Sequence, residues 1–543
     1  MPLDRTTRGL IFAHFLVAFA AFLVAAILGV YQVLERAEII PALISAEGYY
    51  ESVSIHGNLM AYVLTTFFIL GFGYAVAPAS LRQPIWRPGL AWLGFAAMMV
   101  GLVLVAGSLV TGNATVLYTF YPPMIAHWTY YVGSALVLLG SLPWVVIMIV
   151  MMVRWKRRNP GERVPLVMYA TTANAILWAW TLVGVGTEVV FQLIPLSLGW
   201  VEGIDVGLAR TLFVWTLHPI VYFWLLPAYT ALYSLLPPAA GARLYSEIMG
   251  RIVFILLLVF SLPVGIHHLF VDPFQAAGWK LFHAFNTAIV AIPSLLTGFT
   301  ILATLEESGR RRGGRGLFGW IPRLSWGEPM VAAAVGALLM LILGGFGGVV
   351  NSAYAMNTVV HNTMWVTAHF HLIFGGTSVI MYFAIAYLLW PKALGRVLHS
   401  TRLAVIQIVL WFVGMVVLTT PWHMLGLLGE PRRTAFAGYA ETFAGQWEPY
   451  ELTMTVGGAV LLVSSLAFVW NLVATAVGRR APDAATPHLT FSTARDHEEP
   501  IPTMLNGFTL WNWIIALLML VAFGYPILQF FLIETYPMVP FKW

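Results

Sequence analysis

Long apolar runs recur along the whole chain, and short polar stretches separate them. A helix needs about 20 apolar residues to cross the hydrocarbon core of a bilayer. About thirteen runs approach or exceed that length, and we expect helices over 10–33, 53–77, 89–111, 128–153, 166–194, 208–236, 250–270, 279–304, 329–349, 359–390, 402–428, 452–477 and 506–534. The pattern predicts an all-α, polytopic integral membrane protein, built as a helical bundle.

The connections between these runs are too short to hold a separate soluble domain, so we expect residues 1–543 to form a single membrane domain. Composition agrees, since 60% of the 543 residues are hydrophobic and only 9% are charged, which excludes a soluble globular protein. The first apolar run is too long for a cleavable signal and lacks a small-residue cleavage site. We expect it to be the first membrane helix.

The positions of the basic residues predict the orientation of the bundle. They cluster before the first run and after even-numbered runs: Arg5, Arg8, 154–163, 310–316, Lys392, Arg396, Arg479 and Arg480. Because cytoplasmic loops are enriched in Lys and Arg, we expect these loops and the N-terminus to be cytoplasmic. The formal charge of +5 then reflects topology and does not indicate nucleic-acid binding. Arg432 and Arg433 are the exception on the outer side.

Six histidines fall at similar depth in the outer half of the predicted membrane region. They lie on four different helices: His56, His218, His267, His268, His369 and His371. An imidazole inside a membrane is costly and usually faces the bundle interior or a functional site. One histidine alone could simply bond to a neighbouring helix. Six together favour a metal or cofactor site, whereas single histidines such as His283 and His423 are expected to be bonded packing groups.

His369 and His371 are two residues apart, which is a rotation of about 200° on a helix. They must therefore point to opposite sides and cannot share one metal, although they can serve two cofactors. His218 and Tyr222 are four residues apart and lie on one face, with their side chains within reach of each other.

His267 and His268 are adjacent, so their rings diverge by about 100° on a regular helix. Both can reach one metal only at a helix end or in a distorted turn, which Pro263 and Gly265 would allow. Together with His218 they supply three imidazoles without a nearby carboxylate or thiolate, a set that suits copper and is also compatible with zinc. The chain has no cysteine, so any thiolate centre must lie on a partner.

Four motifs resemble those of the catalytic subunit I of the haem-copper oxygen reductases. They are "HPIVYFW" (218–224), "HH" (267–268), "HFH" (369–371) and "HG" (56–57). The similarity extends to 114–123, 315–320, 359–363 and 431–433, and favours the B-type branch of cytochrome c oxidases. It implies a terminal respiratory oxidase in the inner (cytoplasmic) membrane of a prokaryote. Such an enzyme reduces O2 to water and couples this to proton uptake and pumping.

The resemblance implies a ligand for each metal group. His56 and His371 would be the two axial ligands of a low-spin haem, expected to be b-type, and His369 the single ligand of a high-spin haem, expected to be a-type. A haem with both positions filled can only pass electrons, whereas one with a single histidine keeps a face open for oxygen.

The same resemblance assigns His218, His267 and His268 to one copper ion, copper B. Tyr222 would be the tyrosine that is cross-linked to His218 in this family and supplies an electron and a proton. His218 and Tyr222 are therefore the expected catalytic residues.

Arg432 and Arg433 resemble the arginines that neutralise haem propionates, and His361 resembles a residue near the high-spin haem propionate. The alternative for the arginines is an exposed loop pair. Asn357 stands where close relatives can carry Asp, which puts a proton-loading role there in doubt.

Hydroxyl groups on two predicted helices form stripes at steps of three, four or seven residues. Beyond Tyr222 these are Tyr229, Tyr233, Ser294, Thr297 and Thr300. Ile220 occupies the position of a glutamate in the better-known A-type oxidases, so a route through that carboxyl is absent. The stripes resemble the B-type K-pathway for protons. The alternative is that each hydroxyl bonds to its own helix carbonyls.

The implied partners are a subunit II carrying a dinuclear copper centre, a small accessory membrane subunit, cytochrome c as electron donor, O2 and the lipid bilayer. A quinol oxidase is an alternative, because the donor is decided largely by subunit II. A nitric oxide reductase would share the six histidines but would have acidic residues near His218 and no Tyr222. A secondary transporter would explain the hydropathy but not the histidines.

Overall fold

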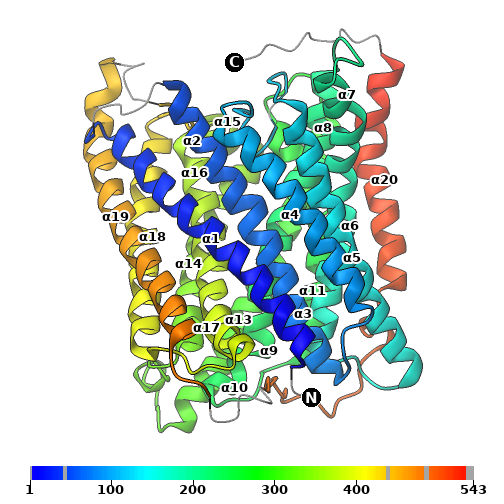
Figure 1. Cartoon of the computed structure of the whole chain (residues 1–543), viewed down its shortest axis with the longest axis vertical. Coiled ribbons are helices and arrows are strands. Elements are labelled where there is room, and N and C mark those ends of the chain that lie inside the picture. Colours follow the sequence, from blue (N-terminus) through cyan, green and yellow to red (C-terminus); the bar gives the residue numbers. More distant parts are fainter. Residues whose placement is uncertain (1–2, 41–45, 121, 436–440, 482–487, 534–543) are drawn as a thin grey trace.

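The computed structural model describes residues 3–40, 46–120, 122–435, 441–481 and 488–533. For residues 441–444 it describes the backbone only. Its helices run side by side along the long axis and form one bundle (Figure 1). Within the described residues no strand forms, and twelve helical segments are long and apolar enough to cross a membrane. The predicted all-α membrane bundle is confirmed.

The twelve segments follow the predicted runs closely, although residue 534 of the last run lies outside the described residues. Their helices are α1 (Arg5–Arg36), α2 (Ala46–Asn58) with η1 (Leu59–Leu64) and α3 (Thr65–Leu81), α4 (Pro88–Val110), α5 (Trp128–Arg158), α6 (Leu166–Glu188) with η2 (Val189–Leu193) and α7 (Ile194–Ser197), α8 (Val206–Leu217) with α9 (Pro219–Ser234), α12 (Ala277–Ile289) with α13 (Ala291–Arg311), α14 (Pro329–Ser352), α16 (Met364–Phe370) with η5 (His371–Ser378) and α17 (Val379–Leu394), α18 (Thr401–Leu427), α19 (Glu441–Val477) and α20 (Thr509–Leu532). Three shorter helices are α10 (Leu236–Ala240), α11 (Glu247–Phe260) and α15 (Tyr354–Val360).

The predicted continuous helix over 250–270 is wrong in its second half. Helix α11 has only 14 residues and ends at Phe260, and the chain then turns into the short 3-10 segment η3 (Gly265–Leu269). Pro263 disfavours a longer helix, because it lacks an N–H and its ring crowds the preceding turn. Gly265 packs so closely on α8 that a Cβ there would lie 2.0 Å from the carbonyl oxygen of Val214. The described part of the chain therefore holds twelve long spans, and the two adjacent histidines occupy a tight turn.

Irregular turns occur where the predicted metal ligands lie. His218 is the junction between α8 and α9, where Pro219 begins the second helix. His371 is the first residue of the π-helical segment η5, and His56 lies just before the π-helical segment η1. Such π-turns often mark functional sites, because they re-aim side chains without ending the helix.

The two ends of the bundle differ in charge. The loops that carry 154–163 and 310–316 both lie at the lower end in Figure 1, which we call the basic end. Helix α15 lies toward the opposite end. The prediction that the basic end faces the cytoplasm, with the N-terminus beside it, stays a prediction.

Candidate functional site

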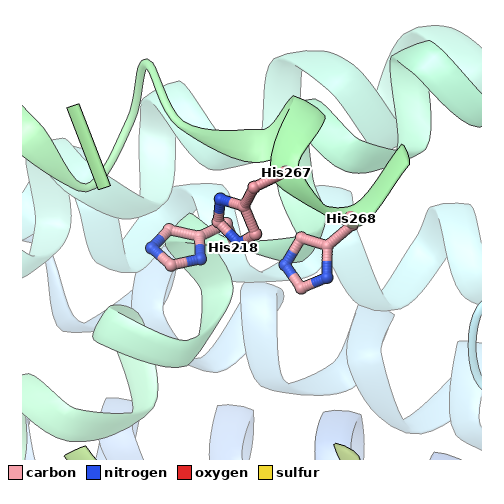
Figure 2. Close-up of side chains that lie close together, drawn as sticks. All are labelled: His218, His267 and His268. Atoms are coloured by element: carbon pink, nitrogen blue, oxygen red, sulfur yellow. The ribbon is translucent and has the colours of Figure 1, made fainter. Parts of the chain in front are cut away.

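His218, His267 and His268 form a compact three-histidine cluster. One ring nitrogen from each lies within 4.8 Å of the others, and Figure 2 shows His267 and His268 reaching from one turn toward His218. Within the described residues, the Nε2 atoms of His218 and His268 are buried and have no hydrogen-bond partner. A buried polar nitrogen without a partner costs free energy, and a metal ion would remove that cost. The donor set of three neutral imidazoles suits copper and is also compatible with zinc.

A hydrogen-bond chain that sequence reasoning missed fixes the orientation of His267. Its Nδ1 lies 2.9 Å from Oγ1 of Thr287, and that hydroxyl donates its own proton to the carbonyl of His283 at 2.6 Å. Thr287 must therefore accept from His267 Nδ1–H, which leaves Nε2 of His267 unprotonated and able to bind a metal. The His283 ring accepts from the N–H of Ile266 at 3.2 Å, which supports its expected packing role and steadies the turn.

The rings of His56 and His371 lie close together and nearly parallel. Their ring centres are 6.3 Å apart and their planes differ by 20°. Metal–imidazole bonds of about 2.0 Å, with each ring centre about 1.1 Å behind its nitrogen, require ring centres about 6.2 Å apart. The two rings therefore fit the axial positions of a single iron.

All three predicted iron ligands present Nδ1 to a backbone carbonyl at the same distance of 2.8 Å. The acceptors are Ala25 for His56, Thr367 for His371 and Gly344 for His369. Each Nδ1 therefore carries the proton, and each Nε2 is left to bind metal.

His369 and His371 lie on opposite flanks of their helix, as their spacing predicts. His369 bonds to α14 and lies against Gly347 and Gly348 of that helix, where a Cβ would be 3.3 and 2.9 Å from its ring. The ring of His371 instead packs edge-on against Trp422 of α18, with ring centres 4.9 Å apart. One short helix thus presents two ligands to two separate spaces.

Both spaces belong to one cavity of about 870 Å³, which the six histidines and Tyr222 line. That volume lies in the upper range for cofactor sites, as large planar groups require. Arg36, Arg432 and Arg433 line it as well. Guanidinium groups at the edge of a cavity suit carboxylate groups on a bound cofactor.

The loop that carries Arg432 and Arg433 is held in place by an ion pair and hydrogen bonds that sequence reasoning missed. Arg36, at the end of α1, forms a buried ion pair with Glu430 and donates to the carbonyls of Pro431 and Thr434 at 3.3 Å. Arg36 was one basic residue at the end of an apolar run, and nothing in its spacing pointed to a partner almost 400 residues away.

His361 lines the same cavity as the arginines. Its Nδ1 donates to Oδ1 of Asn357 at 3.2 Å, and Arg432 donates to Oδ1 of the neighbouring Asn362 at 2.9 Å. Burial lowers the pKa of His361 to about 4, and the guanidinium groups of Arg432 and Arg210 act in the same direction. The imidazole is therefore neutral at pH 7.

The predicted catalytic tyrosine lies beside the three-histidine cluster. The ring centres of Tyr222 and His218 are 5.1 Å apart, because the two residues lie on one face across the junction of α8 and α9. Ile220 is buried between them in sequence, and it offers no carboxyl.

The predicted hydroxyl stripes meet across helices α9 and α13. Tyr229 donates to Oγ of Ser294 and Tyr233 donates to Oγ1 of Thr297, both at 3.2 Å. Thr297 and Thr300 also donate to carbonyls of their own helix, at 2.9 and 2.8 Å, as the alternative interpretation expected. The two interpretations are compatible, since a hydroxyl can donate to its own helix and accept from a neighbour.

Comparison with known proteins gives consistent matches. The family described as "Cytochrome C and Quinol oxidase polypeptide I" matches residues 9–460. Cytochrome c oxidase subunit 1 of Thermus thermophilus is 39% identical over 534 residues, covering 95% of this chain and 94% of that protein. Haem-copper oxidase subunit I+III of Aeropyrum pernix is 27% identical, covering 79% and 52%.

Comparison of the fold with solved structures points to the same family as the sequence matches. A haem-copper terminal oxidase dimer, solved by cryo-electron microscopy, matches with a TM-score of 0.93 and 34% identity over 99% of this chain and 95% of that one. The chain therefore belongs to the family of subunit I of the cytochrome c and quinol oxidases, and it is the catalytic subunit of a haem-copper terminal oxidase of the cytochrome c oxidase type.

Proposed function

We propose that six histidines of this subunit hold the metal groups at which O2 is reduced to water. His218, His267 and His268 would hold copper B, His369 would hold the high-spin haem, and His56 and His371 would hold the low-spin haem. The observation that carries the proposal is the 6.3 Å separation of the nearly parallel His56 and His371 rings, which suits one iron. When bound, these groups supply electron transfer and an iron with an open face for oxygen.

The chain itself orients these ligands before any metal binds. The carbonyls of Ala25, Thr367 and Gly344 hold three rings in one tautomer, and Thr287 does the same for His267. Fixed rings lose little conformational freedom on binding, which raises metal affinity.

Tyr222 is the proposed proton and electron donor beside His218, and Tyr229, Tyr233, Ser294, Thr297 and Thr300 form the proton route to it. Each hydroxyl can accept a proton on one side and donate on the other by rotating. The two bonds that join α9 to α13 support a continuous route. Ile220 leaves this subunit without a carboxyl at the position that A-type oxidases use.

Arg432, Arg433 and His361 are the proposed contacts of the haem propionates, supported by their place on the cavity wall. A neutral His361 adds no charge to the cavity wall, and because its single N–H is donated to Asn357, its Nε2 would meet a carboxylate through a bridging water. Arg36 holds the arginine loop in position through Glu430.

Several finer assignments rest on the resemblance alone. We propose a b-type low-spin haem, an a-type high-spin haem and the B-type branch. The proposed partners are a subunit II with a dinuclear copper centre, a small accessory subunit and cytochrome c. The proposed setting is the inner membrane of a prokaryote with the N-terminus in the cytoplasm, where the basic end of the bundle suits the cytoplasmic side. A quinol donor is the alternative, and the family description includes quinol oxidases.

The ligand assignments are tested by comparing His371→Ala with His369→Ala in the intact oxidase. The first should remove the low-spin haem spectrum. The second should leave that spectrum in place and abolish carbon monoxide binding, because only His369 holds the open iron. Loss of the same spectral bands in both variants would contradict the assignment of His369 and His371 to different haems. Metal analysis of the wild-type oxidase should give copper at the three-histidine site, and non-haem iron there would indicate a nitric oxide reductase instead.

A further inference from the structure

Helix α20 lies outside the part of the chain that the family comparison matches. The match covers residues 9–460, whereas α20 spans Thr509–Leu532. The helix runs along one edge of the bundle (Figure 1) and packs against α8, α11 and α12. Helix α8 ends beside His218, and α12 carries both His283 and Thr287. Helix α20 therefore contacts two of the helices that surround the three-histidine cluster.

Pro526 makes one carbonyl of α20 available to a neighbouring helix. In a regular helix the carbonyl of Ala522 accepts from the N–H four residues on, but that residue is Pro526, which has no N–H. Ala522 is fully buried, so its carbonyl is shielded from water and needs another donor. That donor is Nε2–H of His283 on α12, at 3.1 Å.

The two hydrogen bonds of the His283 ring fix its tautomer. A carbonyl can only accept and a backbone N–H can only donate, so Nε2 carries the proton for Ala522 and Nδ1 accepts from the N–H of Ile266 at 3.2 Å. Ile266 is the residue before His267, in the tight turn η3. The fully buried ring of His283 therefore bridges a carbonyl of α20 and the backbone of the histidine turn.

A second connection joins His283 to the same turn. Its backbone carbonyl accepts from the hydroxyl of Thr287 at 2.6 Å, and that hydroxyl lies 2.9 Å from Nδ1 of His267. The ring of His283 holds the backbone before His267, whereas the backbone of His283 holds the hydroxyl that orients the His267 ring. Replacing the His283 ring removes the first connection and keeps the second, which separates its role from that of Thr287.

Phe523, the next residue of α20, packs against both segments that carry the cluster. Gly265, at the start of η3, lies so close that a Cβ there would be 3.3 Å from Cζ of Phe523. The Phe523 ring also packs against Trp215 of α8, with ring centres 4.9 Å apart, and Trp215 lies three residues before His218. Phe523 therefore touches the turn that carries two histidines and the helix that leads to the third.

The histidine turn is too short to fix its own position. Segment η3 has five residues, and the hydrogen bonds of a 3-10 turn have poorer geometry than those of an α-helix. Imidazoles that share one metal must be held within about 0.5 Å of the binding geometry. The turn therefore depends on bonds from neighbouring helices.

We propose that His283 is a positioning residue for the three-histidine cluster and that α20 is the support that holds it. The carbonyl of Ala522 fixes the His283 ring, and the ring fixes the N–H of Ile266, so that η3 keeps its two histidines in reach of His218. The inference rests on the proposed copper site. It gives His283 a role beyond the packing expected from the sequence, and it gives α20 a part in the site.

The test compares His283→Leu with His283→Gln in the intact oxidase. Leucine makes neither hydrogen bond, whereas the glutamine amide offers an acceptor and a donor on neighbouring atoms, as the neutral ring does. The measurements are the copper-to-haem ratio after exposure to a copper chelator, and the infrared stretching frequency of carbon monoxide bound to the copper after photolysis from the haem.

His283→Leu should lower the affinity for copper by about tenfold, the lower end for groups behind a metal ligand, because His283 acts on the backbone of the turn and not on a ligand ring. It should also shift the carbon monoxide band and leave both haem spectra unchanged. His283→Gln should recover most of the copper and most of the band position.

His14→Leu is the matched control. His14 is also a fully buried single histidine bonded to a carbonyl, that of Leu10 in its own helix, and it is not among the residues that line the cavity. His14→Leu should match the wild type in copper retention and in the carbon monoxide band. The proposal is overturned if His283→Leu behaves as His14→Leu does, or if His283→Gln recovers nothing.

Pro526→Ala tests the part assigned to α20. It supplies the missing N–H, which competes with His283 for the carbonyl of Ala522, and it leaves every side chain of the cluster unchanged. The carbon monoxide band should shift in the same direction as in His283→Leu, by a smaller amount. A band at the wild-type position would show that α20 has no such part. Should His283→Leu fail to assemble, His283→Gln and Pro526→Ala still give the comparison with the wild type.

The wild-type oxidase separates this inference from the proposed function. If it holds no copper at the three-histidine cluster, the proposed function is wrong, and the role of His283 with it. If it holds copper and His283→Leu retains that copper equally well with an unchanged band, only the role of His283 is wrong.

Discussion

Gly348 on α14 offers a sharp test of the high-spin haem ligand. A Cβ at this position would lie 2.9 Å from Cε1 and 3.5 Å from Nε2 of His369, whereas ordinary contacts begin at 3.4 Å. The ring cannot retreat freely, because its Nδ1 is bonded to the carbonyl of Gly344 at 2.8 Å and Gly347 lies against its Cβ. In Gly348→Ala the imidazole must therefore move by several tenths of an ångström at the atom that would bind iron.

The magnitude follows from the cost of overpacking, which is about 1–3 kcal/mol for one added methyl group in a close-packed interior. If this strain is relieved when the high-spin haem leaves, Gly348→Ala should weaken retention of that haem by about 5- to 150-fold. The assay is the haem-to-protein ratio of the purified oxidase, together with the rate and amplitude of carbon monoxide binding. The low-spin spectrum should be unchanged.

Two glycine variants serve as controls. Gly29→Ala places a Cβ 3.1 Å from Cε1 of His56 and should disturb the low-spin spectrum instead. Gly107→Ala on α4 meets no atom within 4 Å and should behave as the wild type. If Gly348→Ala retains its carbon monoxide-binding haem as well as Gly107→Ala does, or if Gly348→Ala and Gly29→Ala alter the same spectral bands, the assignment of His369 and His56 to different haems is refuted.

Three further outcomes are expected. Tyr222→Phe should retain haem and copper but lose oxygen reduction, and full turnover in that variant would contradict its role. Thr287→Val should lower the affinity for copper by about 10- to 100-fold, because Nδ1 of His267 loses its acceptor, and it should leave both haem spectra unchanged. If the variant keeps the wild-type copper content when a chelator is added, this expectation is wrong. Burial alone would raise the pKa of Asp496, but hydrogen bonds from Ser246 and from the N–H groups of Glu247 and Ile248 lower the pKa overall. A depressed pKa gives stability that is present above the unfolded value of about 3.9 and is lost as pH falls through the folded value. Asp496→Ala should therefore lower the melting temperature at pH 7 and should no longer lower it at a pH below the folded value. An equal shift in melting temperature at pH 7 and at the low pH would contradict this.

The placement of the candidate metal-binding histidines was predictable from sequence because it follows from helix geometry. The spacing of His369 and His371 alone requires two partners, and the structure places the two rings against different helices. The hydroxyl stripes were predictable for the same reason, since regular steps on one helix define a face. That face meets its partner on α9 through Tyr229 and Tyr233, as expected.

The groups that hold the ligands in place were not predictable. The acceptors of His56 and His369 are carbonyls of Ala25 and Gly344, and every residue has a carbonyl, so the sequence contains no signal for them. Thr287 and the ion pair of Arg36 with Glu430 depend on how helices pack in three dimensions. The extent of α11 was overestimated because apolar character continues past Phe260, although Pro263 ends the helical geometry.

The backbone anchors of His369 and His371 have different origins. His371 is bonded to Thr367 within its own helix, so its ring moves with that helix. His369 is hydrogen-bonded to the carbonyl of Gly344 on α14, so the position of its ring depends on a neighbouring helix. A sliding of α14 against α16 would therefore move the ring that we propose as the ligand of the oxygen-binding iron and leave in place the ring that we propose for the electron-donating iron. The two residues are neighbours on one helical segment, but the position of one ring is set by that segment and the position of the other by α14.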